Sequence, residues 1–235
     1  NTSYSDIFIK LMQDKYDVQE SIFEVEFWGN TYSNEYRETA AYVAYMTPAF
    51  GQTYVKVGTA SVARGRGTIY TTPRYYEMFE DNDLRRDWTI SPYIWKDVTE
   101  TTFTKEMYKP QFRFRWPAKF RREYEINTPV YAWGNSTNLP LLRYSDVLLM
   151  FAEADNYVNH GSTTESLEAV NKVKRRGFGF NPNVPVVDVD EVAMDESAFL
   201  KYIQNERARE LGLESHRKLD LLRWGIFFST MEEVG

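Results

Sequence analysis

The residues best able to do chemistry lie near the end of the sequence, where acidic and basic side chains alternate. Glu206, Glu210 and Glu214 are spaced four residues apart, so a helix would bring their carboxylates to one face. Arginines surround them, and a guanidinium binds a carboxylate through two parallel hydrogen bonds. We therefore expect a structural ion network that fixes the packing of helices. Its expected members are Glu206, Arg207, Glu210, Arg217, Asp220 and Arg223.

Two kinds of reactive site are the alternatives for these carboxylates. A glycoside hydrolase needs two carboxyl groups about 5 to 9.5 Å apart, one with a raised pKa, whereas neighbouring arginines lower the pKa of a carboxyl group. A metal ion could bind Glu210, Glu214 and His216, but the sequence has only two histidines and no cysteine to supply the usual ligands. We expect no catalytic residue, no metal site and no cofactor.

A second group of residues is suited to binding a sugar without reacting with it. Aromatic and arginine side chains alternate with Gly and Pro between Tyr42 and Tyr76. A sugar ring presents an apolar CH face, which packs on an aromatic ring, and hydroxyl groups, which hydrogen bond to polar side chains. Burial in a core is the alternative for each aromatic residue. The expected ligand-binding residues are Phe50, Tyr54, Arg64, Arg66 and Tyr70.

Two regions of different texture must position these groups. In residues 1–139, Pro and Gly recur so often that long helices are excluded except over 33–46. We expect a helix near 5–15, a short strand within 20–28 and long aromatic-rich loops elsewhere. This region is the candidate ligand-binding face, and we expect it to form one compact unit with residues 140–235.

Residues 140–235 follow the periodicity of helices. A first helix is expected to end at Gly161, and Ser162 with Glu165 is expected to form a capping box for a second helix that ends near Gly177. Together they would form a hairpin like one tetratricopeptide unit, followed by a charged third helix over 196–214. The predicted buried face of the first helix consists of Val147, Leu148, Phe151, Ala154 and Val158.

Composition narrows the classes of partner. The net charge of −6 and the isoelectric point near 5.2 argue against nucleic acid and anionic lipid. The absence of cysteine excludes disulfides and thiolate-bound zinc. No apolar run is long enough for a membrane span, and no signal peptide is recognisable at the start.

Three segments of the helical region closely resemble the SusD/RagB family. They are Leu142-Arg-Tyr-Ser-Asp-Val-Leu-Leu-Met-Phe-Ala-Glu-Ala154, Glu168-Ala-Val-Asn-Lys-Val-Lys-Arg-Arg176 and the segment from Ile203 to Gly225, which ends in Asp-Leu-Leu-Arg-Trp-Gly. Weaker similarities begin at Glu20, Asp83 and Lys119. The resemblance implies a mainly α SusD-like fold with tetratricopeptide-like hairpins, long aromatic-rich loops and a few short strands.

The same resemblance implies a function and a location. Family members are non-catalytic proteins that bind oligosaccharide or polysaccharide nutrients and deliver them to a TonB-dependent transporter of the SusC type. They are outward-facing lipoproteins of the outer membrane, so the chain would be the C-terminal portion of a protein whose lipid anchor is absent from this sequence. The alternatives are a helical scaffold that binds a peptide and a glycoside hydrolase.

Overall fold

The computed structural model describes residues 3–27, 55–57, 60–62, 70–96, 104–109, 115–126 and 137–234. Four of the expected ligand-binding residues, Phe50, Tyr54, Arg64 and Arg66, lie outside these ranges, as does the helix expected over 33–46. The fold is mainly α with a few short strands, as the sequence predicted. Among the described residues, no helix is both long and apolar enough to cross a membrane.

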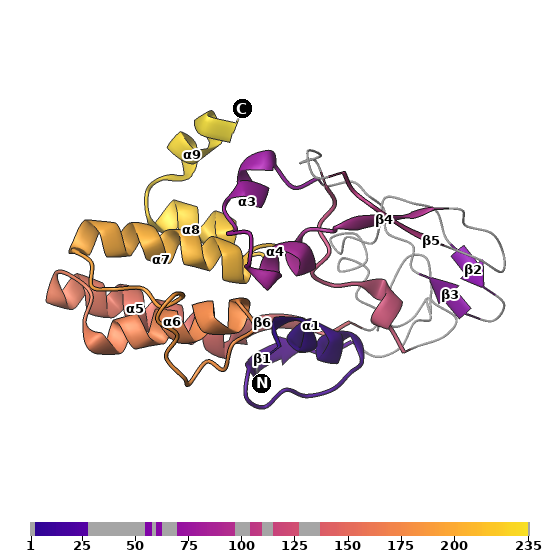
Figure 1. Cartoon of the computed structure of the whole chain (residues 1–235), viewed down its shortest axis with the longest axis horizontal. Coiled ribbons are helices and arrows are strands. Elements are labelled where there is room, and N and C mark those ends of the chain that lie inside the picture. Colours follow the sequence, from indigo (N-terminus) through magenta and orange to yellow (C-terminus); the bar gives the residue numbers. More distant parts are fainter. Residues whose placement is uncertain are drawn as a thin grey trace, which may run out of the picture.

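The helices of the C-terminal region form a layer at one end of the molecule (Figure 1). Helix α5 packs against both α6 and α7 around one hydrophobic cluster. Helices α8 and α9 follow α7 at the end of the chain. The bounds are α5 (Tyr144–Asn159), α6 (Thr164–Gly177), α7 (Glu196–Leu211), α8 (Arg217–Arg223) and α9 (Phe227–Val234).

The buried face predicted for α5 is wrong. Phe151 and Val158 are 46% and 72% exposed, whereas Leu149 and Ala152 are fully buried. Apolar residues occupy two sides of this helix, so hydrophobicity alone does not identify the inner one. Polar residues share that inner side because their groups are bonded: the Asn156 side-chain amide donates to the backbone oxygen of Glu196 at 3.0 Å.

Two helix boundaries also differ from the prediction. The capping box of α6 is made by Thr163 and Ser166, because Ser162 instead bonds the backbone of Met194 through its hydroxyl group. Helix α7 ends at Leu211 rather than at Glu214, since Leu213 adopts a left-handed conformation with a φ of 67°.

Residues 3–126 contribute short elements that lie on one side of the helical layer (Figure 1). The expected N-terminal helix and first strand are present, and the strand β1 pairs antiparallel with β6. Helix α1 forms a second hydrophobic cluster with Trp88 and Phe120. The hairpins β2–β3 and β4–β5 lie at the other end of the molecule (Figure 1). The bounds are α1 (Tyr4–Met12), β1 (Ser21–Val25), β2 (Val55–Val57), β3 (Ala60–Val62), α3 (Pro73–Glu77), α4 (Leu84–Thr89), β4 (Tyr93–Lys96), β5 (Thr104–Met107), the 3-10 helix (Arg122–Tyr124) and β6 (Leu139–Arg143).

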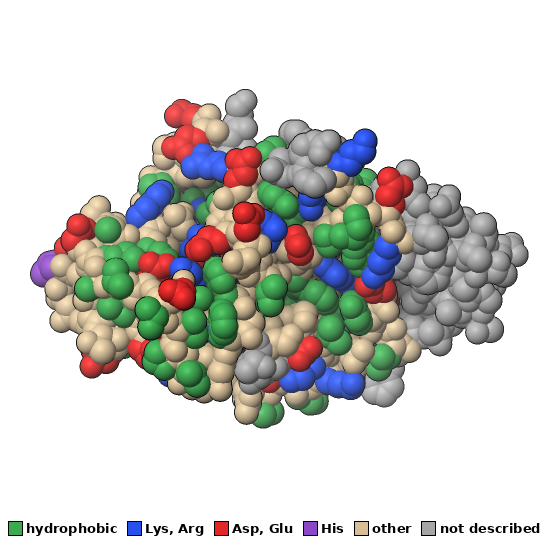
Figure 2. Space-filling view, viewed as in Figure 1, with side chains coloured by type: hydrophobic (Ala, Val, Ile, Leu, Met, Phe, Trp, Pro, Cys, Tyr) green, Lys and Arg blue, Asp and Glu red, His purple; other side chains and the backbone are tan. Residues whose placement is uncertain are grey.

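The surface carries both signs of charge. On the face shown in Figure 2, acidic and basic side chains are interspersed over the described surface, with apolar side chains gathered between them. The described part of that face therefore offers apolar and mixed polar contacts to a partner.

Candidate functional site

Helix α7 directs its carboxylates into a network of ion pairs between the helical layer and the short N-terminal elements. Glu210 lies at its centre, completely buried, and accepts from Arg176 at 2.7 Å and from Arg85 and Arg143 at 3.2 Å each. Its members form a balanced set of five cations and five carboxylates. They are Arg85, Lys119, Arg143, Arg176 and Arg209 with Glu20, Asp83, Glu206, Glu210 and Glu214.

Two arginines from outside α7 hold most of this network together. Arg85, on α4, binds Asp83 at 2.7 Å and Glu206 at 2.6 Å with no exposed surface. Arg143, at the end of β6, binds Glu214 through two nitrogens at 2.6 and 2.8 Å. Glu214 lies beyond the end of α7, yet its carboxylate joins the same network as Glu210. The network therefore links segments that are distant in the sequence.

The electrostatics of the network oppose acid catalysis by these carboxylates. Burial raises the pKa of Glu210, but Arg176, Arg143 and Arg85 outweigh it and bring that pKa well below its usual range. The pKa of Glu206 is lowered in the same way by Arg85 and Arg209. Burial lowers the pKa of Lys119 to about 8. The carboxylates of Glu206 and Glu210 are anionic at neutral pH, so they cannot donate a proton as the general acid of a glycosidase must.

The other expected members of the network form a smaller cluster. Arg207 binds Asp146 at 2.6 Å and Asp220 at 2.8 Å, and Asp220 also binds Arg223 at 2.9 Å. Arg217 differs from its expected role, because it donates to the backbone oxygen of Gln204 at 2.9 Å. Five of the six residues are thus divided between two clusters, Glu206 and Glu210 in the larger one and Arg207, Asp220 and Arg223 in the smaller one.

Sequence reasoning missed the partners of α7. Glu20, Asp83, Arg85, Lys119, Arg143 and Arg176 were not expected in the network. All six stand in, or at the start of, segments that resemble the family, with Arg85 in the segment that begins at Asp83. The presence of charged residues in those segments was the sequence signal that could have identified these residues as partners of α7. The metal site considered for Glu210, Glu214 and His216 is not formed, and no acidic or histidine cluster in the described ranges could hold a metal ion.

An aromatic shelf, formed by Tyr70, Trp116 and Tyr108, lies away from the network. The Tyr70 and Trp116 ring centroids are 5.2 Å apart at an angle of 33°, and those of Trp116 and Tyr108 are 6.2 Å apart at 36°. The backbone nitrogen and hydroxyl of Thr71 both donate to the Arg115 backbone oxygen at 2.9 Å, which brings Tyr70 beside Trp116.

One ring of the aromatic shelf, that of Tyr70, is exposed, while Trp116 and Tyr108 are partly buried. Tyr70 is 53% exposed and offers a large apolar side chain to solvent. The Arg115 guanidinium lies 5.3 Å from the Tyr108 ring centroid and 4.6 Å from that of Tyr76, so it packs against both rings. In contrast, the hydroxyl of Tyr75 donates to the Ala208 backbone oxygen at 3.0 Å and belongs to the packing around α7. Of the five expected ligand-binding residues, Tyr70 is the one that the described ranges include.

Comparison with known proteins decides the family. A model of the SusD family matches residues 19–234. The chain belongs to the SusD family. A curated SusD-like protein, P25 of Formosa agariphila, is 32% identical over 171 residues, which are 72% of this chain and 28% of that protein. The match places both the ion network and the aromatic shelf within the family's region of similarity.

Solved SusD structures share the fold. A SusD homologue of Bacteroides thetaiotaomicron superposes with a TM-score of 0.82 at 24% identity, over 100% of this chain and 46% of that one. A laminarin-binding SusD-like protein superposes with a TM-score of 0.66 at 21% identity, over 100% of this chain and 48% of its own. The chain therefore spans less than half the length of these SusD relatives.

Proposed function

We propose that the chain is part of a cell-surface protein that binds an oligosaccharide or polysaccharide without cleaving it. The observation that carries the proposal is the exposed Tyr70 ring beside Trp116. An exposed aromatic ring of this kind matches the CH face of a sugar ring, and it lies in the region 1–139, to which we assign the ligand-binding face. Phe50, Tyr54, Arg64 and Arg66 are proposed to extend this face.

The absence of catalysis is supported by the state of the acidic groups. The carboxylates of Glu206, Glu210 and Glu214 have lowered pKa values and are bonded to arginine or lysine. None of these three supplies the protonated carboxyl group of a general acid. Capture followed by release is the mechanism that remains for a ligand on an exposed aromatic surface.

Delivery and location are proposed from family membership. SusD-like proteins whose names record glycan binding share this fold, among them the laminarin-binding relative. The chain would then act as an outward-facing outer-membrane lipoprotein that passes its ligand to a TonB-dependent transporter of the SusC type. The intermixed charges and apolar patches in Figure 2 suit a protein partner.

Affinity electrophoresis against a panel of polysaccharides, with analysis of products in the same samples, tests the proposal. We expect retardation without products, and a dissociation constant about tenfold higher after Tyr70→Ala or Trp116→Ala because each removes a stacking surface. Tyr157→Ala is the control, since Tyr157 is a 78% exposed tyrosine on α5, away from the shelf. Equal binding by all three variants would refute the assignment, and released sugars would refute the non-catalytic mechanism.

The scaffold alternative has one observation in its favour. A groove of about 650 Å³ lies between α3, α7, α8 and α9, lined in part by Met78, Leu221, Ile226 and Met231. Apolar grooves between helices bind amphipathic peptides. A peptide that binds wild type and Tyr70→Ala equally, when neither binds polysaccharide, would favour this alternative.

A further inference from the structure

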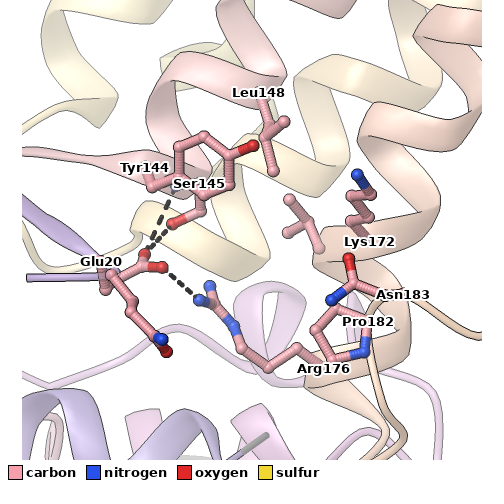
Figure 3. A pocket seen from close by; sticks show the side chains of 10 residues that line it. Glu20, Tyr144, Ser145, Leu148, Lys172, Arg176, Pro182 and Asn183 are labelled. Carbon is pink, nitrogen blue, oxygen red and sulfur yellow. Dashed lines mark hydrogen bonds and ion pairs between the residues drawn. The ribbon is translucent and has the colours of Figure 1, made fainter. Parts of the chain in front are cut away.

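A small cavity separate from the aromatic shelf lies between the start of β1, α5, α6 and the segment after α6. Its volume is about 240 Å³, which is below the roughly 300–1,000 Å³ of pockets that hold drug-sized ligands. It therefore suits a single ring rather than an oligosaccharide. Figure 3 shows Tyr144, Lys172, Arg176 and Asn183 around the space, with Glu20 paired to Arg176 at one side.

Polar groups without a partner converge on this cavity. Arg176 is not among them, because its terminal nitrogens bind Glu20 at 2.5 Å and Glu210 at 2.7 Å. Within the described ranges, the side chains of Tyr144, Lys172 and Asn183 make no hydrogen bond or ion pair. The cavity therefore has polar side chains on its wall that a ligand could bond without displacing a contact within the protein.

The unused groups are mainly hydrogen-bond donors. The carboxylate of Glu20 is already occupied, because it accepts from Arg143 at 2.6 Å, from Arg176 and from the Ser145 hydroxyl at 2.5 Å. Its charge and that of Glu210 are balanced by the two arginines. The ammonium group of Lys172 is therefore an uncompensated positive charge at the cavity. A ligand with a carboxylate would satisfy both the charge and the free donors.

Besides Gln19, Ser145 and the polar groups above, the lining includes apolar side chains. Val173 is one of these, and Figure 3 shows Leu148 and Pro182 around the space together with the ring of Tyr144. An aromatic ring with aliphatic neighbours suits the CH face of a sugar, while hydroxyl groups would bond Asn183 and the Tyr144 hydroxyl.

We propose that this cavity binds one carboxylated sugar residue of the uronic acid class. The choice of a sugar rests on the proposed function, whereas the preference for a carboxylate rests on the cavity alone. The site lies on the helical layer, so it would hold an acidic unit of a glycan, or a free sugar acid, separately from the aromatic shelf.

Separate titrations of the purified protein with D-galacturonate, D-galactose and sulfate, each monitored by NMR, test the proposal. We expect galacturonate to bind at least about tenfold more tightly than either of the others, and Lys172→Gln to weaken it by about tenfold or more through loss of a charge-assisted contact. Lys218→Gln, at an exposed lysine on α8, is the control with the same change in net charge. Asn183→Ala should also weaken binding, and its exposed position leaves folding intact.

The possible outcomes separate the two proposals. Equal binding of galactose and galacturonate, equal binding of sulfate, or unchanged affinity in both Lys172→Gln and Asn183→Ala would overturn the uronic acid site. Tyr70→Ala should weaken polysaccharide binding and leave galacturonate binding unchanged. A wild-type protein that binds polysaccharide but not galacturonate refutes only the cavity proposal, whereas one that binds galacturonate but not polysaccharide refutes only the function assigned to the shelf.

Discussion

Replacing Glu210 by Gln should destabilise the protein strongly although the side chain keeps its size. The carboxylate accepts from Arg85, Arg143 and Arg176 in a fully buried position. Its loss leaves four carboxylates facing five cations. Removing one partner from a buried ion network costs about 3–5 kcal/mol, a large part of the ~5–15 kcal/mol that stabilises a typical domain.

Differential scanning calorimetry measures this effect directly. At about 2–4 °C per kcal/mol for chains of this size, the melting temperature should fall by roughly 6–20 °C. The matched control is Glu233→Gln, because Glu233 pairs with Arg74 where both side chains are more than half exposed, and such pairs contribute less than about 1 kcal/mol. A similar, small change in both variants would refute the conclusion that the network depends on charge balance.

Two further predictions concern the same network. Glu206 and Glu210 have pKa values below that of the unfolded chain, so their stabilisation is complete above about pH 4.5 and is lost as pH falls further. The free energy of unfolding, measured in urea between pH 5 and pH 3, should decrease, and its slope should be shallower in Glu210→Gln; equal slopes would contradict this assignment. Gly177→Ala should cost about 3 kcal/mol, the upper end of the usual overpacking cost, since the new Cβ would lie 2.4 Å from Nε and 2.7 Å from Cζ of the buried Arg85. At Gly225 the same change meets no atom within 4 Å and should cost only the backbone penalty of about 1–2 kcal/mol; an equal or larger melting shift at Gly225 would contradict the steric reasoning.

The apolar spacing of the sequence predicted the helices, because helix formation depends mainly on residues that are near one another in the sequence. The existence of α5, α6 and α7 follows from apolar spacing and from the turn near Gly161. The inner face of α5 did not follow, because its burial depends on bonds made by Ser145 to Glu20 and by Asn156 to Glu196. An analysis of hydrophobic periodicity places polar residues on the surface, so it misplaces buried polar residues such as Ser145 and Asn156 whose side chains are hydrogen bonded.

The candidate sites show the same limit. Residue types on α7 indicated arginine–carboxylate pairing, but the partner Arg85 lies 125 positions before Glu210. One sequence gives no information about which distant segments meet. Tyr70 was selected from composition, yet Trp116 becomes its neighbour only through the contact of Thr71 with Arg115. No sequence pattern indicated the cavity beside Lys172, because only the structure shows which of its polar side chains have no hydrogen-bond partner.

The long reach of the ion network has a consequence for the kinetics of folding. The contact between Glu20 and Arg176 joins positions 156 apart, and that between Arg143 and Glu20 joins positions 123 apart. Closing such loops loses chain entropy before any contact is gained. Burying a charged side chain is also costly until its partners are in place to form ion pairs with it. The network should therefore assemble after the main barrier to folding, so that substitutions within it speed unfolding while refolding rates change little.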